Sequence, residues 1–211
     1  MTRLPVLFLI LLSLAGPARA EPGDAAAIMR LVAASEARIH QTADTHRACI
    51  RTETFATALD SNRDQRRNLA RMIASGRDEP ALRERHDALA APDYRWTRPS
   101  TPPSASWTDN VPLPPAEART LSDAAGAIVR GDARPRIVER VEAEWLPDFA
   151  FCAGDRAVST IGFSAPAIRG DIAFVETGFT CGSPCGNGLL YALRHDRRGW
   201  AIVAVVRTWI S

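Results

Sequence analysis

Lysine is absent from this chain of 211 residues, and all 26 of its basic residues are arginine. This absence excludes a lysine nucleophile and a phosphate-binding loop of the kind that uses lysine. Long apolar runs are also scarce. The one that stands out covers residues 6–14, about half of the roughly 20 residues that a membrane-spanning helix needs. We therefore expect no transmembrane segment in the mature chain.

The N-terminus has the pattern of a cleavable secretory signal peptide. Arg3 precedes the apolar run, and Ala18 and Ala20 place small residues where a signal peptidase accepts them. We predict a signal peptide over residues 1–20 that is cleaved after Ala20. The mature chain, residues 21–211, is then exported to the periplasm or secreted, and is expected to be soluble.

Charge is balanced in the predicted mature chain. Two arginines leave with residues 1–20, so 24 arginines face 24 acidic residues. A net charge of zero gives no electrostatic reason to expect nucleic acid as a partner. No nucleotide-binding loop and no divalent-metal signature occurs either, so we expect no cofactor and no metal. A protein in the cell envelope is the partner that these exclusions leave open.

The four cysteines are Cys49, Cys152, Cys181 and Cys185. An even number in an exported chain favours disulfides over free thiols. Three pairings are possible. We prefer Cys181 with Cys185, because the close pair is the easiest to join, and Cys49 with Cys152 follows by elimination.

The first part of the mature chain, residues 21–91, is predicted to be helical. Apolar spacing indicates a helix over about 25–50, a second from 61–64 to Gly76, and a short third helix over about 80–90.

Residues 92–116 form a proline-rich connection in which Tyr94, Trp96 and Trp107 are interleaved with seven prolines. Proline fixes φ and removes a backbone donor, so this segment is predicted to be extended. A linker that packs its aromatic residues on the domain surface is favoured over a partner-recognition tract.

Residues 117–211 are predicted to be an α+β region. A helix should start at Thr120 or Ser122 and end at Gly131, and residues 135–146 fit a helix slightly better than a strand. Four strands follow, over 157–163, 171–180, 188–194 and 199–209.

Short connections between these strands predict sequential antiparallel pairing. In the last strand, alternation places Trp200, Ile202, Ala204 and Val206 on one face. The fold class expected is therefore α+β, with N-terminal helices packed against a C-terminal antiparallel meander of about four strands, and residues 21–211 forming one domain.

The segment CGSPCGNG, residues 181–188, is the most distinctive local motif, and four hypotheses compete for it. It can be a disulfide-locked turn, a dithiol redox site, part of a zinc site or a phosphate-binding loop. Redox cysteines are normally separated by two residues at a helix N-terminus, whereas three residues separate these two. A zinc site would need His195, which we expect about seven residues, or roughly 23 Å, along a strand from the cysteines. The locked turn is preferred.

No catalytic residue is assigned. His46 lies three residues before Cys49, and His40 lies near one turn before His46, so a nucleophile or a metal pair is conceivable there. A cysteine that faces the core for a disulfide, with histidines on the surface, is preferred. His86 and His195 stand alone. We therefore favour a non-enzymatic binding or structural module. The alternatives are thiol–disulfide exchange through Cys181 and Cys185, or a hydrolase in which a histidine meets a serine, a cysteine or a carboxylate.

The C-terminal stretch resembles a group of uncharacterised exported bacterial proteins. The resemblance covers about residues 157–211 and rests on five segments, which are STIGFS (159–164), AFV (173–175), CGSPCGNG (181–188), GWAI (199–202) and WIS (209–211). Pro184 departs from the pattern, where an aliphatic residue is expected, and Phe174 departs in a strand that usually ends in a tyrosine-rich segment. The resemblance implies an exported bacterial protein with a hairpin at the motif, and it implies no activity.

Overall fold

The computed structural model describes residues 22–41, 48–77, 79–99, 110–131, 140–147, 149–153, 159–181 and 185–211. The predicted signal peptide with its cleavage position after Ala20, and also His46 and Trp107, lie outside these residues. Within the described ranges, no helix has the length and apolar character that crossing a membrane requires.

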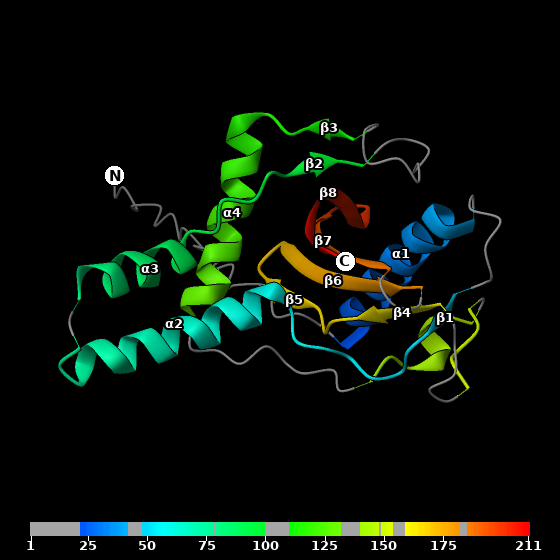
Figure 1. Cartoon of the computed structure of the whole chain (residues 1–211). Coiled ribbons are helices and arrows are strands. Elements are labelled where there is room, and N and C mark those ends of the chain that lie inside the picture. Colours follow the sequence, from blue (N-terminus) through cyan, green and yellow to red (C-terminus); the bar gives the residue numbers. More distant parts are fainter. Residues whose placement is uncertain are drawn as a thin grey trace, which may run out of the picture.

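Four α-helices and one short 3-10 helix occur in the described residues (Figure 1). They are α1 (Pro22–Gln41), α2 (Ala58–Ala74), α3 (Pro80–Ala90), α4 (Pro115–Arg130) and η2 (Ala143–Trp145). The start of α2 is earlier than predicted because Thr57 caps it. The Thr57 hydroxyl accepts a hydrogen bond from the backbone nitrogen of Asp60, and the Asp60 carboxylate accepts one from the backbone nitrogen of Thr57.

The sheet has eight strands in the order β1-β4-β6-β7-β8-β2-β3, with β5 paired to β6. The strands are β1 (Cys49–Ile50), β2 (Thr97–Arg98), β3 (Val111–Pro112), β4 (Thr160–Phe163), β5 (Ala167–Arg169), β6 (Ile172–Thr180), β7 (Gly186–Asp196) and β8 (Gly199–Ile210). Strands β4, β6, β7 and β8 pair antiparallel in sequence. The predicted α+β class and the C-terminal meander are therefore confirmed.

The helix predicted over residues 25–50 is wrong at its C-terminal end. Helix α1 ends at Gln41, and Cys49–Ile50 form strand β1, which lies parallel to β4. The backbone nitrogen of Ile50 donates to Ala150, which is far away in the sequence. Long-range pairing thus decides the structure of this segment, and the region 21–91 is not purely helical.

The proline-rich connection also contributes to the sheet. Its two short strands, β2 and β3, pair with each other, and Thr97 of β2 lies opposite Val205 of β8. Pro112 fits there because β3 is an edge strand, where a missing backbone donor is tolerated. The aromatic residue Trp96 is buried rather than on the surface, and its indole donates to Ser122 in α4.

Strand β8 contains two bulges, which change the faces predicted for it. Ala192 lies opposite Ala204, but Leu193 lies opposite Ile202, so Val203 is the extra residue. Trp200 and Ile202 therefore pack on one face of the sheet while Ala204 and Val206 pack on the other. The prediction that these four residues share a face is wrong.

The segment 135–146 is largely outside the described residues. In its described part, Arg140 forms a bridge with Glu53, and residues 143–145 form only a 3-10 turn. The helix preferred there is therefore wrong for residues 140–146.

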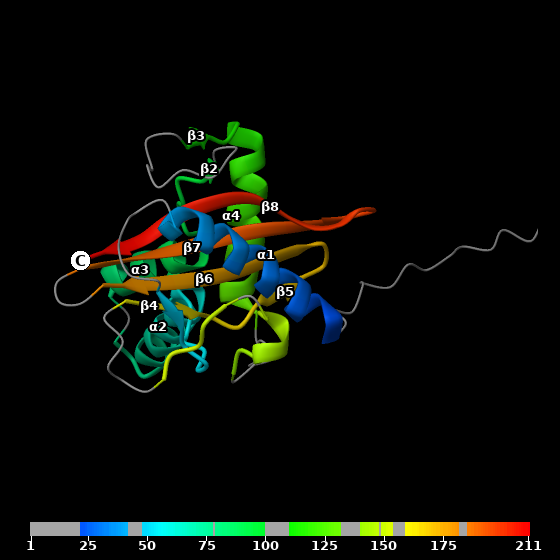
Figure 2. The same ribbon diagram turned by 90° about the vertical axis from the view of Figure 1, so that its right-hand side faces the viewer.

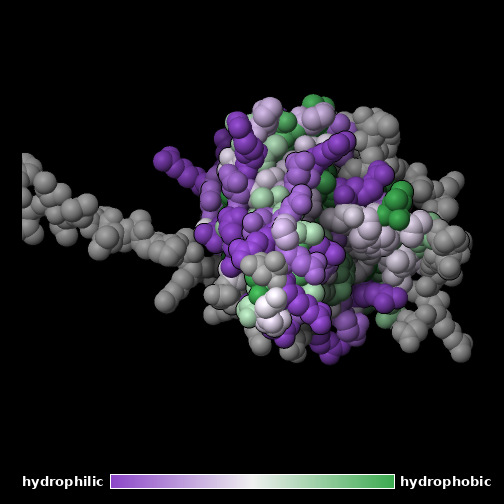
Figure 3. Space-filling view, turned by 60° about the vertical axis from the view of Figure 1, so that its left-hand side comes forward, coloured by the Kyte–Doolittle hydropathy of each residue, from purple (hydrophilic) through white to green (hydrophobic). Residues whose placement is uncertain are grey.

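The two faces of the sheet carry separate apolar cores. Helix α1 covers one face, where Ile28, Met29 and Val32 pack with Val175 and Tyr191. Helix α4 and the start of α2 cover the other face (Figures 1 and 2). The α2–α3 pair turns a mainly hydrophilic surface outward (Figure 3).

Candidate functional site

A row of glycines lies on the face of the sheet that α2 and α4 cover. Gly162 on β4 lies opposite Gly178 on β6, which lies opposite Gly188 on β7. Gly186 lies two residues before Gly188 on the same face. We call these four residues the glycine floor. The lack of side chains leaves room for groups that approach the sheet backbone from above.

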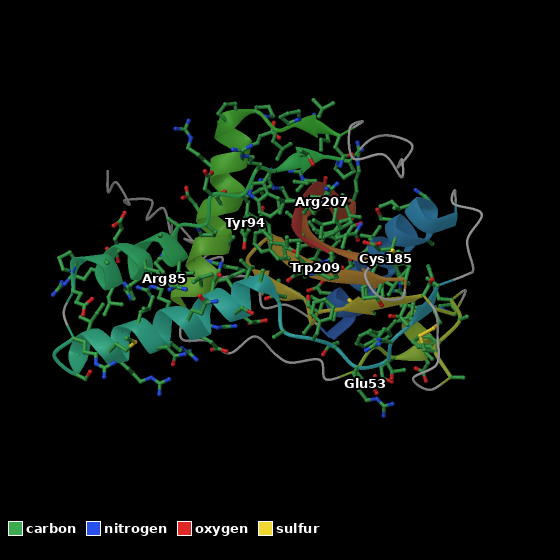
Figure 4. All side chains as sticks on the ribbon, viewed as in Figure 1. Glu53, Arg85, Tyr94, Cys185, Arg207 and Trp209 are labelled. Atoms are coloured by element: carbon green, nitrogen blue, oxygen red, sulfur yellow. A yellow bond between two sulfur atoms is a disulfide. The ribbon has the colours of Figure 1, made fainter. Side chains whose placement is uncertain are left out.

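Two aromatic rings fill that room. Phe55 lies over Gly162, where an added Cβ would be 3.3 Å from its ring, and Trp209 of β8 lies over Gly186 and Gly188. A Cβ on Gly188 would overlap the Trp209 indole. We call the glycine floor with Phe55 and Trp209 the aromatic platform. Figure 4 shows Trp209 and Cys185 labelled on the sheet.

The platform is exposed on its outer side. Phe55 keeps 36% of its surface exposed and Trp209 keeps 38%. Both rings are held by backbone contacts as well as by the glycines, because the Phe55 nitrogen donates to Phe163 and Trp209 lies opposite Gly188. The result is a rigid aromatic surface that contacts solvent.

A buried carboxylate lies beside the platform. Glu176 is two residues before Gly178 on the same face of β6 and is only 3% exposed. Its Oε2 accepts a hydrogen bond of 2.5 Å from the Ala58 nitrogen, and its Oε1 accepts one of 2.6 Å from the Thr208 hydroxyl. Its backbone nitrogen donates to the Ser164 hydroxyl. Burial raises the pKa of Glu176, while the hydrogen bonds from Thr208 and Ala58 oppose that rise.

Tyr94 is the titratable neighbour of this carboxylate. Its hydroxyl oxygen is buried and has no hydrogen-bond partner within the described residues. Burial, together with the charge of Glu176, raises the pKa of Tyr94 to about 12. Tyr94 is therefore neutral at physiological pH.

A second buried carboxylate lies on the opposite face of β6. Glu36 of α1 accepts hydrogen bonds of 2.6 Å from the Thr177 hydroxyl and 2.8 Å from the Tyr191 hydroxyl. Burial and the proximity of Glu36 raise the pKa of Tyr191 well above its ordinary value. This group fixes α1 to the sheet, and its location under the helix gives it a structural role.

The structure pairs the cysteines in the preferred way. Cys49 is joined to Cys152 with a Cα–Cα distance of 4.9 Å, and Cys181 is joined to Cys185 with one of 5.2 Å. Cys181 follows strand β6 and Cys185 precedes strand β7. Neither position provides the helix N-terminus that stabilises a thiolate in redox proteins. The bridge instead closes the loop next to Gly186, at one end of the aromatic platform.

The two histidines whose side chains the structure describes do not join this site. His195 lies at the far end of β7 from the cysteines, and its ring meets Trp200 edge-on at 5.0 Å between centroids. His86 pairs with its neighbour Asp87 at 2.9 Å on the surface of α3. The side chains of His40 and His46 lie outside the described residues. Among the described residues, no group of three His, Cys, Asp or Glu side chains could hold a metal ion.

Of the glycine floor, the sequence motif singled out Gly186 and Gly188 but not Gly162 and Gly178, and it missed the purpose of all four. It assigned Gly186 and Gly188 to turn geometry, whereas Gly188 is needed because Trp209 packs against the backbone there. It also missed Phe55, Glu176 and Thr208. Strand alternation across 172–180 places Glu176 on the same face as Gly178, and a charged residue between apolar strand neighbours is the signal that would have indicated a buried carboxylate.

Comparison with protein-family models, with curated proteins and with solved structures gives no match.

Proposed function

We propose that the protein is an exported, non-enzymatic binding module of the bacterial envelope, and that the aromatic platform binds a protein partner. The observation that carries this proposal is the exposure of Phe55 and Trp209, the two rings that pack over the glycine floor. Export rests on the signal-peptide pattern of residues 1–20 and on the resemblance of the C-terminal stretch. The two disulfides are compatible with it.

Aromatic side chains provide much of the energy of protein–protein interfaces, and tryptophan is especially enriched there. Ordering side chains on binding costs free energy, so residues that are already fixed bind at a lower cost. Trp209 is fixed by its contacts with Gly186 and Gly188 before any partner arrives.

The geometry adds no support to the two enzymatic alternatives. Thiol–disulfide exchange would require an activated thiol at Cys181 or Cys185, and both residues adjoin strands rather than a helix. A hydrolase would require a histidine placed against a nucleophile. The two histidines whose side chains are described contact Asp87 and Trp200 instead.

Site-specific photo-crosslinking in the producing cell tests the proposal. A photoreactive phenylalanine derivative replaces Phe55, whose ring is partly exposed on the platform. The matched control replaces Arg85 on α3, on the hydrophilic side of the molecule (Figures 3 and 4). We expect a discrete protein adduct from position 55 that is absent from position 85, and a lower yield when Trp209→Ala is added.

No adduct from position 55, or the same adducts from both positions, would overturn the binding proposal. Export is tested separately by sequencing the N-terminus of the protein from the envelope and medium fractions. We expect it to begin at Glu21. An uncleaved protein in the cytoplasmic fraction would contradict export.

A further inference from the structure

A small cavity of about 200 Å³ lies on the α4 side of the sheet, away from the aromatic platform. Helix α4, the β2–β3 pair and the neighbouring strands β7 and β8 surround it (Figure 1). Its lining is Arg98, Leu113, Glu117, Leu121, Arg194, Ile202 and Val203. The cavity therefore has an apolar part formed by four aliphatic side chains and a polar part formed by three charged ones.

The three charged residues differ in whether they are neutralised. Arg98 and Glu117 form an ion pair with a distance of 3.0 Å between Nη2 and Oε2, and both side chains are more than half exposed. Arg194 is only partly exposed, and its Nε is buried without a hydrogen-bond partner among the described residues. A buried guanidinium nitrogen that makes no hydrogen bond is costly for the fold. Arg194 is thus the part of the cavity that lacks a partner.

We propose that this cavity binds a small monocarboxylate, with the carboxylate on Arg194 and a short apolar tail against Leu113, Leu121 and Val203. The lining carries one net positive charge, because Glu117 offsets Arg98, so a single negative charge balances it. A guanidinium binds a carboxylate through two parallel hydrogen bonds, which the two terminal nitrogens of Arg194 can donate. The proposal does not depend on the protein partner proposed above.

The size of the cavity limits the ligand. A closed apolar cavity of about 150 Å³ holds benzene, so a cavity of about 200 Å³ suits roughly eight non-hydrogen atoms. Hexanoate has this size and the required charge. Phosphate has a suitable charge for arginine but no apolar tail, and hexanol has a similar tail without the charge.

Isothermal titration calorimetry of the full mature protein with hexanoate tests the proposal. We expect saturable binding at one site, weaker binding of acetate and hexanol, and a loss of affinity of at least about tenfold in Arg194→Gln. The matched control is Arg197→Gln, which removes the same charge from the exposed β7–β8 turn. Its affinity should equal that of the wild type.

A second variant keeps the test decisive if Arg194→Gln fails to fold. Val203→Phe fills the cavity without changing its charge and should abolish hexanoate binding while near-ultraviolet circular dichroism stays native. No hexanoate binding by the wild type would overturn the proposal, as would unchanged affinity in Val203→Phe or in folded Arg194→Gln. Equal binding of hexanol, or tighter binding of phosphate than of hexanoate, would overturn the monocarboxylate assignment.

Discussion

The carboxylate of Glu176 in β6 accepts a hydrogen bond of 2.5 Å from the backbone nitrogen of Ala58, the first residue of α2. A negative charge at a helix N-terminus is favourable, because the unpaired backbone N–H groups there carry partial positive charge. The same contact joins α2 to the centre of the sheet. Burial works against it, because the ionised form of Glu176 loses its hydration.

Replacing Glu176 with glutamine should make the stability of the protein depend less on pH. Folding raises the pKa of Glu176, so the unfolded state releases this proton at lower pH than the folded state does. The contribution of Glu176 to stability is therefore complete below its unfolded pKa and is lost as pH rises through its folded pKa. As pH rises from below the unfolded pKa to above the folded pKa, the free energy of unfolding of Glu176→Gln should increase relative to that of the wild type. The increase should be about 1.4 kcal/mol for each unit by which folding raises the pKa.

Urea unfolding at pH 4 and pH 7 measures this difference. The stability of Glu176→Gln minus that of the wild type should be larger at pH 7 than at pH 4. The control is Glu117→Gln, in which an exposed carboxylate is removed and the difference should change little between the two pH values. If the stability of Glu176→Gln minus that of the wild type is smaller at pH 7 than at pH 4, the pKa direction stated for Glu176 is wrong.

The two tyrosines of the chain, Tyr94 and Tyr191, should both resist ionisation in the folded protein. Burial raises the pKa of Tyr94 to about 12 and raises that of Tyr191 well above its ordinary value. The stability that this provides is present below the unfolded pKa of about 10 and is lost as pH rises toward 12. Absorbance at 295 nm should stay flat between pH 9 and 11, whereas protein in concentrated urea should titrate near 10. The variant Tyr191→Phe isolates Tyr94, and a midpoint near 10 in that folded variant would refute the prediction.

Alanine at Gly188 should destabilise the protein by about 1–3 kcal/mol, because its Cβ would overlap the Trp209 indole. Gly178→Ala is the matched control on the same face. Its Cβ would lie 3.5 Å from Trp209, which is an ordinary contact, so the cost should not exceed about 1 kcal/mol. The double variant Gly188→Ala/Trp209→Ala should lose less than the sum of the two single losses. Additive losses in urea unfolding would show that Trp209 is not what requires a glycine there.

The two disulfides should differ in their contribution to stability. In the chain-entropy model, a bridge across 103 residues contributes about 4–5 kcal/mol and one across 4 residues about 2 kcal/mol. The double variant Cys49→Ala/Cys152→Ala should therefore unfold at much lower urea concentration than Cys181→Ala/Cys185→Ala. Chemical denaturation without reductant compares them. Equal loss in both variants would indicate that strand pairing of β1 already supplies the constraint.

Strands β4, β6, β7 and β8 could be predicted because their sequence signals are local. In β6 and β7, apolar residues continue for several positions and short connections require antiparallel neighbours. Strand β1 could not, because its two residues pair with Thr160 and Ile161, and nothing near Cys49 distinguishes it from a helix end. The bulge at Val203 could not be predicted either, because it depends on the pairing of β8 with β7. An extra residue in a strand leaves the sequence alternation unmarked but exchanges the faces of every residue beyond it.

The site was predictable only in part. The glycine motif was visible, and so was the preferred disulfide pairing beside it. The partners that explain the site come from distant segments. Phe55 reaches Gly162, and the backbone of Ala58 reaches Glu176 across 118 residues of sequence. Such contacts depend on how α2 crosses the sheet, which no local pattern specifies.

Strand β8 contributes to both apolar cores, through Val205 on the α1 face and Ala204 on the α4 face. Helix α1, near the other end of the chain, has its apolar residues covered by strands that are synthesised more than 100 residues later. We therefore expect helix α1 to pack only after these strands have emerged. For the export proposed above, such late packing of α1 favours passage through a general secretory channel, which accepts unfolded chains.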